Sequence, residues 1–298
     1  MARFTYHLVD VFAKEALSGN GLAVFPVAEQ LPTDLLQRIT REMRQFESIF
    51  LGGTTAPGTY RARIFTMEEE LAFAGHPIIG AAAVLHAAHF GSEDDVQLLF
   101  QLAERTVAVV SRRNGAAYQA EMDQGPATFE PPLGAAARGE LLAALNLSPE
   151  DLMAELPLQV VSTGLPYLIV PLGANLASAR IVRHDFAALL ARVGARFAYL
   201  LDVPAREGRT WDNDGRVEDI ATGSAAGPAG AYLVAHHQAP SDRPLTIHQG
   251  RFLGRPSELT VVVAADMTVR VSGDVVFVGH GELDLPDSFR QLPAGNGA

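Results

Sequence analysis

The sequence contains no cysteine among its 298 residues. Disulfide frameworks, thiolate metal sites and cysteine nucleophiles are therefore excluded. No apolar stretch approaches the roughly 20 residues that a membrane-spanning helix needs, and the first residues lack the apolar core of a signal peptide. These absences predict a cytoplasmic protein with no membrane partner.

Positive charge is also scarce, and it is dispersed. The chain has 23 Lys and Arg against 34 Asp and Glu, a formal net charge of −11, and no basic run that could follow a phosphate backbone. We therefore expect no nucleic-acid partner. A small anionic ligand would be repelled at long range, so its site must draw positive potential from backbone N–H groups or helix N-termini.

The length of the chain favours two domains, because cores tend to divide above roughly 250 residues. Hydrophobic residues make up 48% of the sequence, which is enough to fill two cores. A segment rich in Gly and Pro at residues 125–134 marks a break. We expect one domain over residues 1–125 and a second over residues 126–298.

Both halves combine short strand-like runs with one Ala-rich helix, at residues 77–89 and 225–237. The strand-like runs at 267–272 and 274–279 close the chain. At a constant offset of 148 (223 minus 75), the two helix entries align: Glu70 with Glu218, Ala74 with Thr222, Gly75 with Gly223, His76 with Ser224, and His89 with His237. This register indicates an internal duplication, although two Ala-rich helices could also align by composition alone.

The turns Gly75-His76 and Gly223-Ser224 each begin one of these helices. A helix N-terminus offers unpaired N–H groups and the positive end of the dipole, and glycine permits close approach of a ligand. A pair of such turns can bind the carboxylate of an anionic substrate. The alternative is ordinary capping, in which Thr222 or Ser224 satisfies the first turn of a buried helix.

Two carboxylates are candidates for acid–base chemistry. If the segment from Glu47 to Leu51 is extended, Glu47 shares a face with Ile49 and Leu51, an apolar setting that would raise its pKa. The alternative is a strand glutamate on a solvated face. Asp219, four residues before Gly223, is either an acid–base group or an acceptor of hydrogen bonds from its own loop.

His76 is the histidine at a helix N-terminus, where the dipole lowers its pKa and favours a neutral imidazole that donates a hydrogen bond. The histidines near the helix ends are interpreted as structural, and no carboxylate accompanies them at metal-site spacing, so no metal is expected. The Gly19-Asn20-Gly21 turn lacks the third glycine of a dinucleotide fingerprint, and no P-loop is present. We therefore expect no cofactor.

At these positions the sequence resembles the PhzF-like family, named for the phenazine-biosynthesis isomerase, within the diaminopimelate-epimerase-like fold. The matching motifs cover most of the chain: Val9-Asp10-Val11-Phe12 with Gly19-Asn20, Phe46-Glu47-Ser48, Phe73-Ala74-Gly75-His76-Pro77, Ser162-Thr163-Gly164-Leu165-Pro166-Tyr167-Leu168, Glu218 through Ala226, and Gln249-Gly250 with Gly254-Arg255-Pro256-Ser257.

The resemblance implies an α+β protein of two pseudo-symmetric domains, each a β-barrel-like sheet around a central helix, with the site in the cleft between them and commonly a homodimer. It implies that Glu47 is the catalytic glutamate, with His76 and Asp219 as its acid–base or orienting partners. The residues that would bind substrate are Gly75, Gly223, Ser224 and Asn20.

We therefore expect a cofactor-independent isomerase that moves a proton between carbons of a small unsaturated carboxylate, with Glu47 as general acid and base. Related racemases of this fold use two cysteines, a route that this sequence excludes. Two alternatives stay open. One is an epimerase with Glu47 and Asp219 as opposing bases, and the other is a non-catalytic protein that binds or senses a small ligand.

Overall fold

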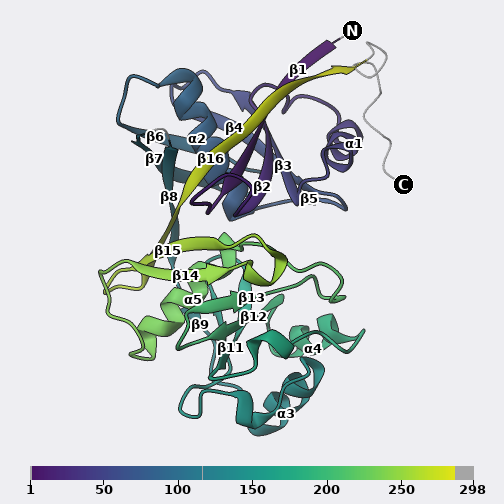
Figure 1. Ribbon diagram of the computed structural model, residues 1–298, viewed down its shortest axis with the longest axis vertical. Helices are drawn as coiled ribbons and strands as arrows, with labels where there is room; N and C mark the ends of the chain where they lie inside the picture. Colours follow the sequence, from purple (N-terminus) through teal and green to yellow (C-terminus); the bar gives the residue numbers. More distant parts are fainter. Residues whose placement is uncertain (1, 116, 286–298) are drawn as a thin grey trace. The chain divides into compact units, whose positions relative to one another are not determined.

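The chain folds into two compact units of mixed α and β structure. The computed structural model describes residues 2–115 and 117–285 (Figure 1). The first unit contains Met1–Met122 and the segment that begins at Ser272, and the second contains Asp123–Val271. The chain leaves the first unit along β8 (Ala117–Pro126) and returns to it along β16 (Thr268–Leu285).

The sheet of the first unit closes on itself. Its order is β1-β2-β3-β4-β6-β7-β8-β16, and β16 also pairs with β1. Its elements are β1 (Ala2–Val11), β2 (Asn20–Phe25), α1 (Thr33–Met43), β3 (Glu47–Gly53), β4 (Thr59–Thr66), β5 (Glu70–Leu71), α2 (Gly75–His89), β6 (Asp95–Gln101) and β7 (Thr106–Asn114).

Helix α2 lies against the inner face of this sheet. Every residue from Gly75 to His86 is buried, as expected for a helix that is apolar on all sides. A Cβ at Gly80 would lie 2.5 Å from Leu22 Cδ2 and 2.9 Å from Val11 Cγ2, so glycine allows the helix to approach β1 and β2 closely. Helix α1 covers the other face, where its leucines pack with Phe50 and Phe65.

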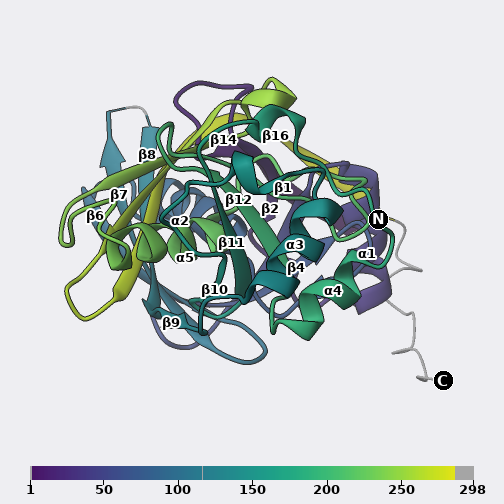
Figure 2. The same cartoon turned by 90° about the horizontal axis from the view of Figure 1, so that it is seen from below.

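The second unit also surrounds a central helix, α5 (Gly223–Ala235), whose residues are buried apart from Ser224, Val234 and Ala235. Helices α3 and α4 lie side by side on the outer face of its sheet (Figure 2). The remaining elements are β9 (Thr128–Phe129), α3 (Ala135–Ala144), β10 (Gln159–Ser162), β11 (Pro166–Leu172), α4 (Phe186–Arg192), β12 (Phe197–Asp202), β13 (Glu207–Arg209), β14 (Leu245–Gln249) and β15 (Ser257–Val263), with short 3₁₀ turns at Pro149–Asp151, Leu176–Ser178 and Arg251–Leu253.

The strands of the two units belong to one continuous sheet, and its two parts repeat one pairing pattern. In the first unit the pairs β1–β2, β2–β3, β3–β4, β4–β6 and β6–β7 alternate between antiparallel and parallel, beginning with antiparallel. The pairs from β10–β11 to β14–β15 follow the same alternation. The central helices begin at Gly75 and Gly223, as the offset of 148 predicts. The predicted pseudo-symmetric α+β fold is therefore confirmed.

An ion pair is also repeated. Arg63 donates through Nε and Nη2 to the two carboxylate oxygens of Glu70, and Arg209 does the same to Glu218. Each guanidinium also lies over the aromatic ring two residues later, 5.2 Å from the centroid of Phe65 in one case and 4.5 Å from Trp211 in the other. We call the pairs Arg63–Glu70 and Arg209–Glu218 the two Arg–Glu forks. Since the sequence register aligned Glu70 with Glu218, these two forks support the duplication independently of helix composition.

The course of the chain after residue 271 differs from the sequence-based expectation. The expected second domain, 126–298, includes residues 272–285, which the structure assigns to the first unit because β16 pairs along β1, from Ala2 opposite Leu285 to Val11 opposite Val275. The expectation of two strands at 267–272 and 274–279 was wrong, since β16 is continuous. Gly273 is not a break: a Cβ there would lie 2.2 Å from Phe12 Cδ1, so glycine makes room for that ring.

The two forks should stabilise the protein to different extents. The side chains of Arg209 and Glu218 are 10% and 9% exposed, against 22% and 35% for Arg63 and Glu70. Because breaking a buried pair leaves an uncompensated charge, Glu218→Gln should lower the free energy of unfolding by about 3 kcal/mol. Glu70→Gln should lower it by about 1 kcal/mol or less. Circular dichroism during chemical denaturation measures both losses, and fluorescence of Trp211, the sole tryptophan, reports the second unit. Equal losses would contradict the prediction.

Candidate functional site

Three buried polar side chains gather in the first unit where β2, β3 and α2 begin. Strands β2 and β3 are parallel, with Leu22 beside Glu47. Because side chains alternate along a strand, Asn20, Leu22 and Glu47 share one face of the sheet. That face carries α2, since Leu22 contacts the helix at Gly80. The cluster therefore consists of Asn20, Glu47 and the helix residue His76, all buried.

Glu47 and His76 are in direct contact. His76 Nδ1 lies 3.3 Å from Glu47 Oε2, and the two side chains are 5% and 7% exposed. The alternative that placed Glu47 on a solvated face is therefore wrong. The local reason is the strand alternation noted above, which turns Glu47 inward with Ile49 and Leu51. A carboxylate and an imidazole so enclosed can pass a proton to a bound molecule with little competition from water.

His76 occupies the second position of α2, after Gly75. Its N-cap residue is Ala74, which makes no side-chain cap. Burial lowers the pKa of His76 to about 3, so the imidazole is neutral at neutral pH. The predicted direction is confirmed, and burial of the imidazole is its cause. Nε2 is buried and has no hydrogen-bond partner among the described residues, an arrangement that calls for an explanation.

In the second unit, Asp219 is held by its own loop. Thr222 donates its hydroxyl proton to Asp219 Oδ2 at 2.5 Å, and the Ala221 N–H donates to Oδ1 at 3.4 Å. Thr222 is the N-cap residue of α5 but makes no side-chain cap there. The alternative of ordinary capping by Thr222 is therefore wrong, because its hydroxyl accepts from Gln249 Nε2 and donates to Asp219 and accepts no N–H of the first helical turn.

Gly223 and Ser224 form the first two positions of α5. The Gly223 carbonyl accepts a hydrogen bond from the Gln124 amide at 2.9 Å. The Ser224 hydroxyl lies 2.8 Å from the Tyr167 hydroxyl, and either can be the donor. Ser224 is partly exposed, whereas Gly223 and Ala225 on either side of it are buried.

The loop and helix start from Asp219 to Ser224 belong to a second polar cluster, of which several residues were not singled out as site residues from the sequence. These residues are buried at strand positions and hydrogen bond within the cluster: Gln249, Tyr199, Tyr167 and Gln124. Gln249 is the clearest case, because it continues the buried face of Leu245 and Ile247 immediately before Gly250. A buried amide inside an apolar pattern is the signal that could have identified it.

Other features considered from the sequence were a structural histidine, a metal site and a membrane-spanning helix. His86 is buried with Nε2 donating to the Glu93 carbonyl, which leaves Nδ1 to accept from Ser111, so its predicted structural role is confirmed. Across the described residues, no cluster of three or more His, Asp or Glu could hold a metal ion. None of the helices in residues 2–115 and 117–285 is long and apolar enough to cross a membrane.

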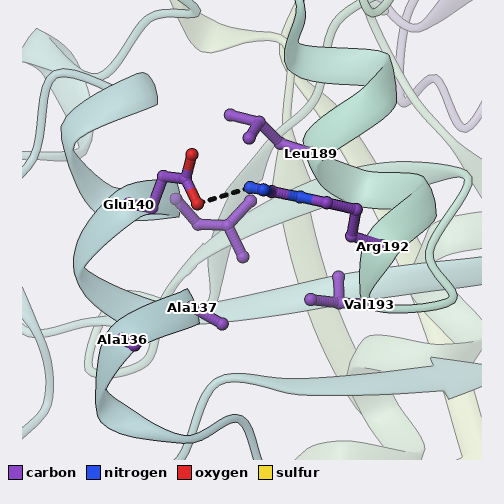
Figure 3. Close-up of a pocket in the computed structure, with 7 residues that line it drawn as sticks. Ala136, Ala137, Glu140, Leu189, Arg192 and Val193 are labelled. Carbon is purple, nitrogen blue, oxygen red and sulfur yellow. Dashed lines mark hydrogen bonds and ion pairs between the residues drawn. The ribbon is translucent and has the colours of Figure 1, made fainter.

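A pocket of about 240 Å³ lies between α3 and α4 in the second unit (Figure 3). Alanine, leucine and valine side chains line it, and Glu140 of α3 is paired with Arg192 of α4 across it. None of the predicted site residues lines this pocket. Since its charged groups satisfy each other, we do not assign it a catalytic role.

A barrel-like sheet around a buried helix, repeated once, is a fold that other solved structures share. A hydroxyproline epimerase of Agrobacterium vitis shares this fold with a TM-score of 0.61 at 14% identity, covering 98% of this chain and 96% of the epimerase. More specifically, the profile of the phenazine biosynthesis-like protein family (PhzC-PhzF) matches residues 9–281. The chain belongs to that family.

Named relatives agree on the enzyme class. The trans-2,3-dihydro-3-hydroxyanthranilate isomerase of Pseudomonas fluorescens is 36% identical over 94% of this chain and 99% of its own length. An uncharacterized isomerase of Escherichia coli, YddE, is 32% identical over 93% and 97%. The solved structure of a predicted epimerase from Pseudomonas aeruginosa is 51% identical with a TM-score of 0.90, covering 96% and 100%. All three names describe isomerases, and the chain is an isomerase.

The neutral state of His76 predicts a pH-dependent stability. Its pKa is about 3 in the folded protein against 6.5 for a free imidazole, so between these values the unfolded state binds more protons. The stability that depends on neutral His76 is complete above pH 6.5 and is lost as the pH falls towards 3, by at most about 1.4 kcal/mol per pH unit. The free energy of unfolding, measured from pH 8 to pH 5, should decrease less steeply in His76→Gln.

The exposed residue His89 provides the matched control for this experiment. His89→Gln should retain the pH slope of the wild type. Identical slopes in the wild type and in His76→Gln would show that His76 does not resist protonation when the protein is folded.

Proposed function

We propose that this isomerase needs no cofactor and that Glu47 moves a proton between two carbons of a small unsaturated carboxylate. The observation that carries the proposal is the buried contact between Glu47 and His76 at the start of α2. A base of this kind needs a site that limits access of water to the substrate, and exchange of the Glu47 carboxyl proton with solvent during the reaction allows D₂O to label the product.

In the proposed mechanism, the Glu47 carboxylate removes a proton from a carbon next to the π-system of the substrate. The electron pair of that C–H bond enters the π-system, and the double bonds shift. Glu47, now a carboxylic acid, returns the proton to another carbon of the same system. One proton leaves and one is added, so the product is an isomer and Glu47 returns to its starting state.

His76 and Asp219 orient the substrate in this proposal. Because His76 is neutral, its ring offers one N–H donor and one acceptor, and the buried Nε2 is suited to a substrate atom. Asp219 Oδ2 already accepts from Thr222. A carboxylate can accept further hydrogen bonds, so Asp219 is suited to a hydroxyl or amino group of the substrate.

The residues proposed to bind the substrate carboxylate lie at the helix entries. Backbone N–H groups at Gly75 and Gly223 and the Ser224 hydroxyl are hydrogen-bond donors at the positive ends of two buried helices. Asn20 adds an amide on the face that carries Glu47. This set supplies local attraction for an anion in a chain whose net charge is −11.

The substrate class follows from these groups and from the relative's name. Trans-2,3-dihydro-3-hydroxyanthranilate combines a carboxylate, an amino group, a hydroxyl group and a partly unsaturated ring, which is the combination of groups that the proposed roles require. We propose this compound, or a small unsaturated acid with the same groups, as the substrate. The homodimer and the cytoplasmic location remain predictions.

An epimerase in which Asp219 is the second base is less well supported. Its carboxylate accepts hydrogen bonds from Thr222 and Ala221, which stabilise the ionised form that must be lost when a base takes a proton. The two reactions also differ in their products. An epimerase would place deuterium from D₂O at an inverted stereocentre, whereas the proposed isomerase moves a double bond.

Proton NMR in D₂O tests the role of Glu47. With trans-2,3-dihydro-3-hydroxyanthranilate as the probe, the wild type should form an isomer with a shifted double bond and incorporate deuterium. Glu47→Gln keeps the size of the side chain but cannot take up the proton, so its rate of exchange should fall by about 10³-fold or more.

Glu29 provides the control, because it is a carboxylate of the same unit that is paired with Arg61 and contacts Gly52 at the opposite end of β3. Glu29→Gln should exchange at nearly the wild-type rate. Undiminished exchange in a folded Glu47→Gln variant would remove Glu47 from the mechanism. Binding of the probe without any exchange by the wild type would favour the non-catalytic alternative.

A further inference from the structure

Gln249 ends β14 directly against the loop that carries Asp219. Its side chain is 1% exposed. The next residue, Gly250, has a φ of +84°, and a Cβ there would lie 2.7 Å from the Ile220 carbonyl oxygen and 2.3 Å from that of Arg255. Only glycine fits this turn without strain. The turn therefore brings the Gln249 amide to the inner side of the loop.

The Gln249 amide makes four hydrogen bonds. Nε2 donates to the Asp219 carbonyl at 2.8 Å and to Thr222 Oγ at 2.9 Å. Oε1 accepts from the Thr222 N–H at 3.2 Å and from the Tyr199 hydroxyl at 3.2 Å. A glutamine side chain has two N–H donors and an oxygen that can accept two hydrogen bonds, so these four bonds use its full hydrogen-bonding capacity.

The orientation of this amide is fixed by the nature of its partners. A backbone carbonyl can only accept and a backbone N–H can only donate, so exchanging Nε2 and Oε1 would break the bonds to Asp219 and to the Thr222 amide. Burial raises the pKa of Tyr199 far above its usual range, which keeps the phenol protonated as a donor. Gln249 therefore has one stable arrangement.

This arrangement determines where the Thr222 hydroxyl proton goes. Thr222 Oγ accepts from Gln249 Nε2, so its single proton is directed to Asp219 Oδ2. An N-cap threonine would otherwise use its oxygen to accept an N–H of the first helical turn. Gln249 thus competes with capping and links Thr222 to the Asp219 carboxylate.

We propose that Gln249 is a positioning residue for the isomerase reaction. It acts through Thr222 and holds the Asp219 carboxylate in the orientation in which it receives the substrate. The inference rests on the proposed function of Asp219, but it adds a requirement: the amide itself, with a donor at Nε2, is needed for full activity, and a side chain of the same shape without that donor is not sufficient.

The substitution that tests this is Gln249→Glu, which keeps the shape and replaces the Nε2 donor with an oxygen. The Thr222 hydroxyl is then free to donate away from Asp219. With trans-2,3-dihydro-3-hydroxyanthranilate as the probe, kcat/KM should fall by about 10²-fold, the usual effect of misplacing an orienting group by about 1 Å. The melting temperature should stay close to that of the control variant.

Gln159→Glu is the matched control. Gln159 is also a buried glutamine on a strand of the second unit, but it bonds to Glu130 and to His236 at the opposite end of α5. It tests the general effect of placing a carboxyl group in this unit. The control should retain kcat/KM within a few-fold of the wild type.

A double-mutant cycle with Asp219→Asn separates positioning from general damage. If Gln249 acts through Asp219, Gln249→Glu should cost little further activity in the Asp219→Asn background. Full additivity, or a loss in Gln249→Glu no larger than in Gln159→Glu, would overturn the inference. If Asp219→Asn itself retains full activity, the proposed role of Asp219 is wrong, and the catalytic part of the inference falls with it.

Hydrogen exchange tests the positioning without a substrate. The Thr222 amide donates to Gln249 Oε1, so its protection should drop by about tenfold or more in Gln249→Leu and stay unchanged in Gln159→Leu. Unchanged protection in Gln249→Leu would show that Gln249 does not hold this loop, whatever the fate of the proposed reaction.

Discussion

The buried starts of α2 and α5 are the constraint on which the rest of the structure depends. A helix leaves its first N–H groups without backbone partners, and burial makes unpaired groups costly. Neither helix has a side-chain cap from its N-cap residue, because Ala74 has no polar group and the Thr222 oxygen accepts from Gln249 instead. A ligand with negative charge would satisfy these groups, which is why the proposed carboxylate sites lie here.

The duplication has kept the frame and changed the side chains. The Arg–Glu forks and the glycines at the helix starts are shared by both units, and they hold equivalent loops in equivalent places. At the position after the glycine, however, His76 stands in one unit and Ser224 in the other. The start of α2 has a carboxylate–imidazole pair, whereas the start of α5 is surrounded by a network of amide and hydroxyl groups. One repeated frame therefore carries two different sets of polar groups.

Local patterns explain what could be predicted from the sequence. The starts of the central helices depend on glycine and on small residues, and the burial of Glu47 depends on strand alternation, so both follow from neighbouring residues. The pairing of β16 with β1 joins residues at opposite ends of the chain, and no local pattern reports it. The diversion of Thr222 from capping likewise depends on Gln249, 27 residues later. Side-chain competition of this kind becomes visible only when the strand and the loop are in place.

The low pKa of His76 affects how Glu47 and His76 can act as a pair. An imidazolium beside Glu47 would stabilise the carboxylate and make it a weaker base. Burial keeps His76 neutral instead, so it does not supply that cation and can still offer a hydrogen bond. A neutral His76 supplies no net positive charge to attract an anionic substrate, which leaves this task to the backbone N–H groups at the start of α2. The first unit therefore separates proton transfer from anion binding: the side chain of Glu47 is suited to the former, and the helix on which His76 stands is suited to the latter.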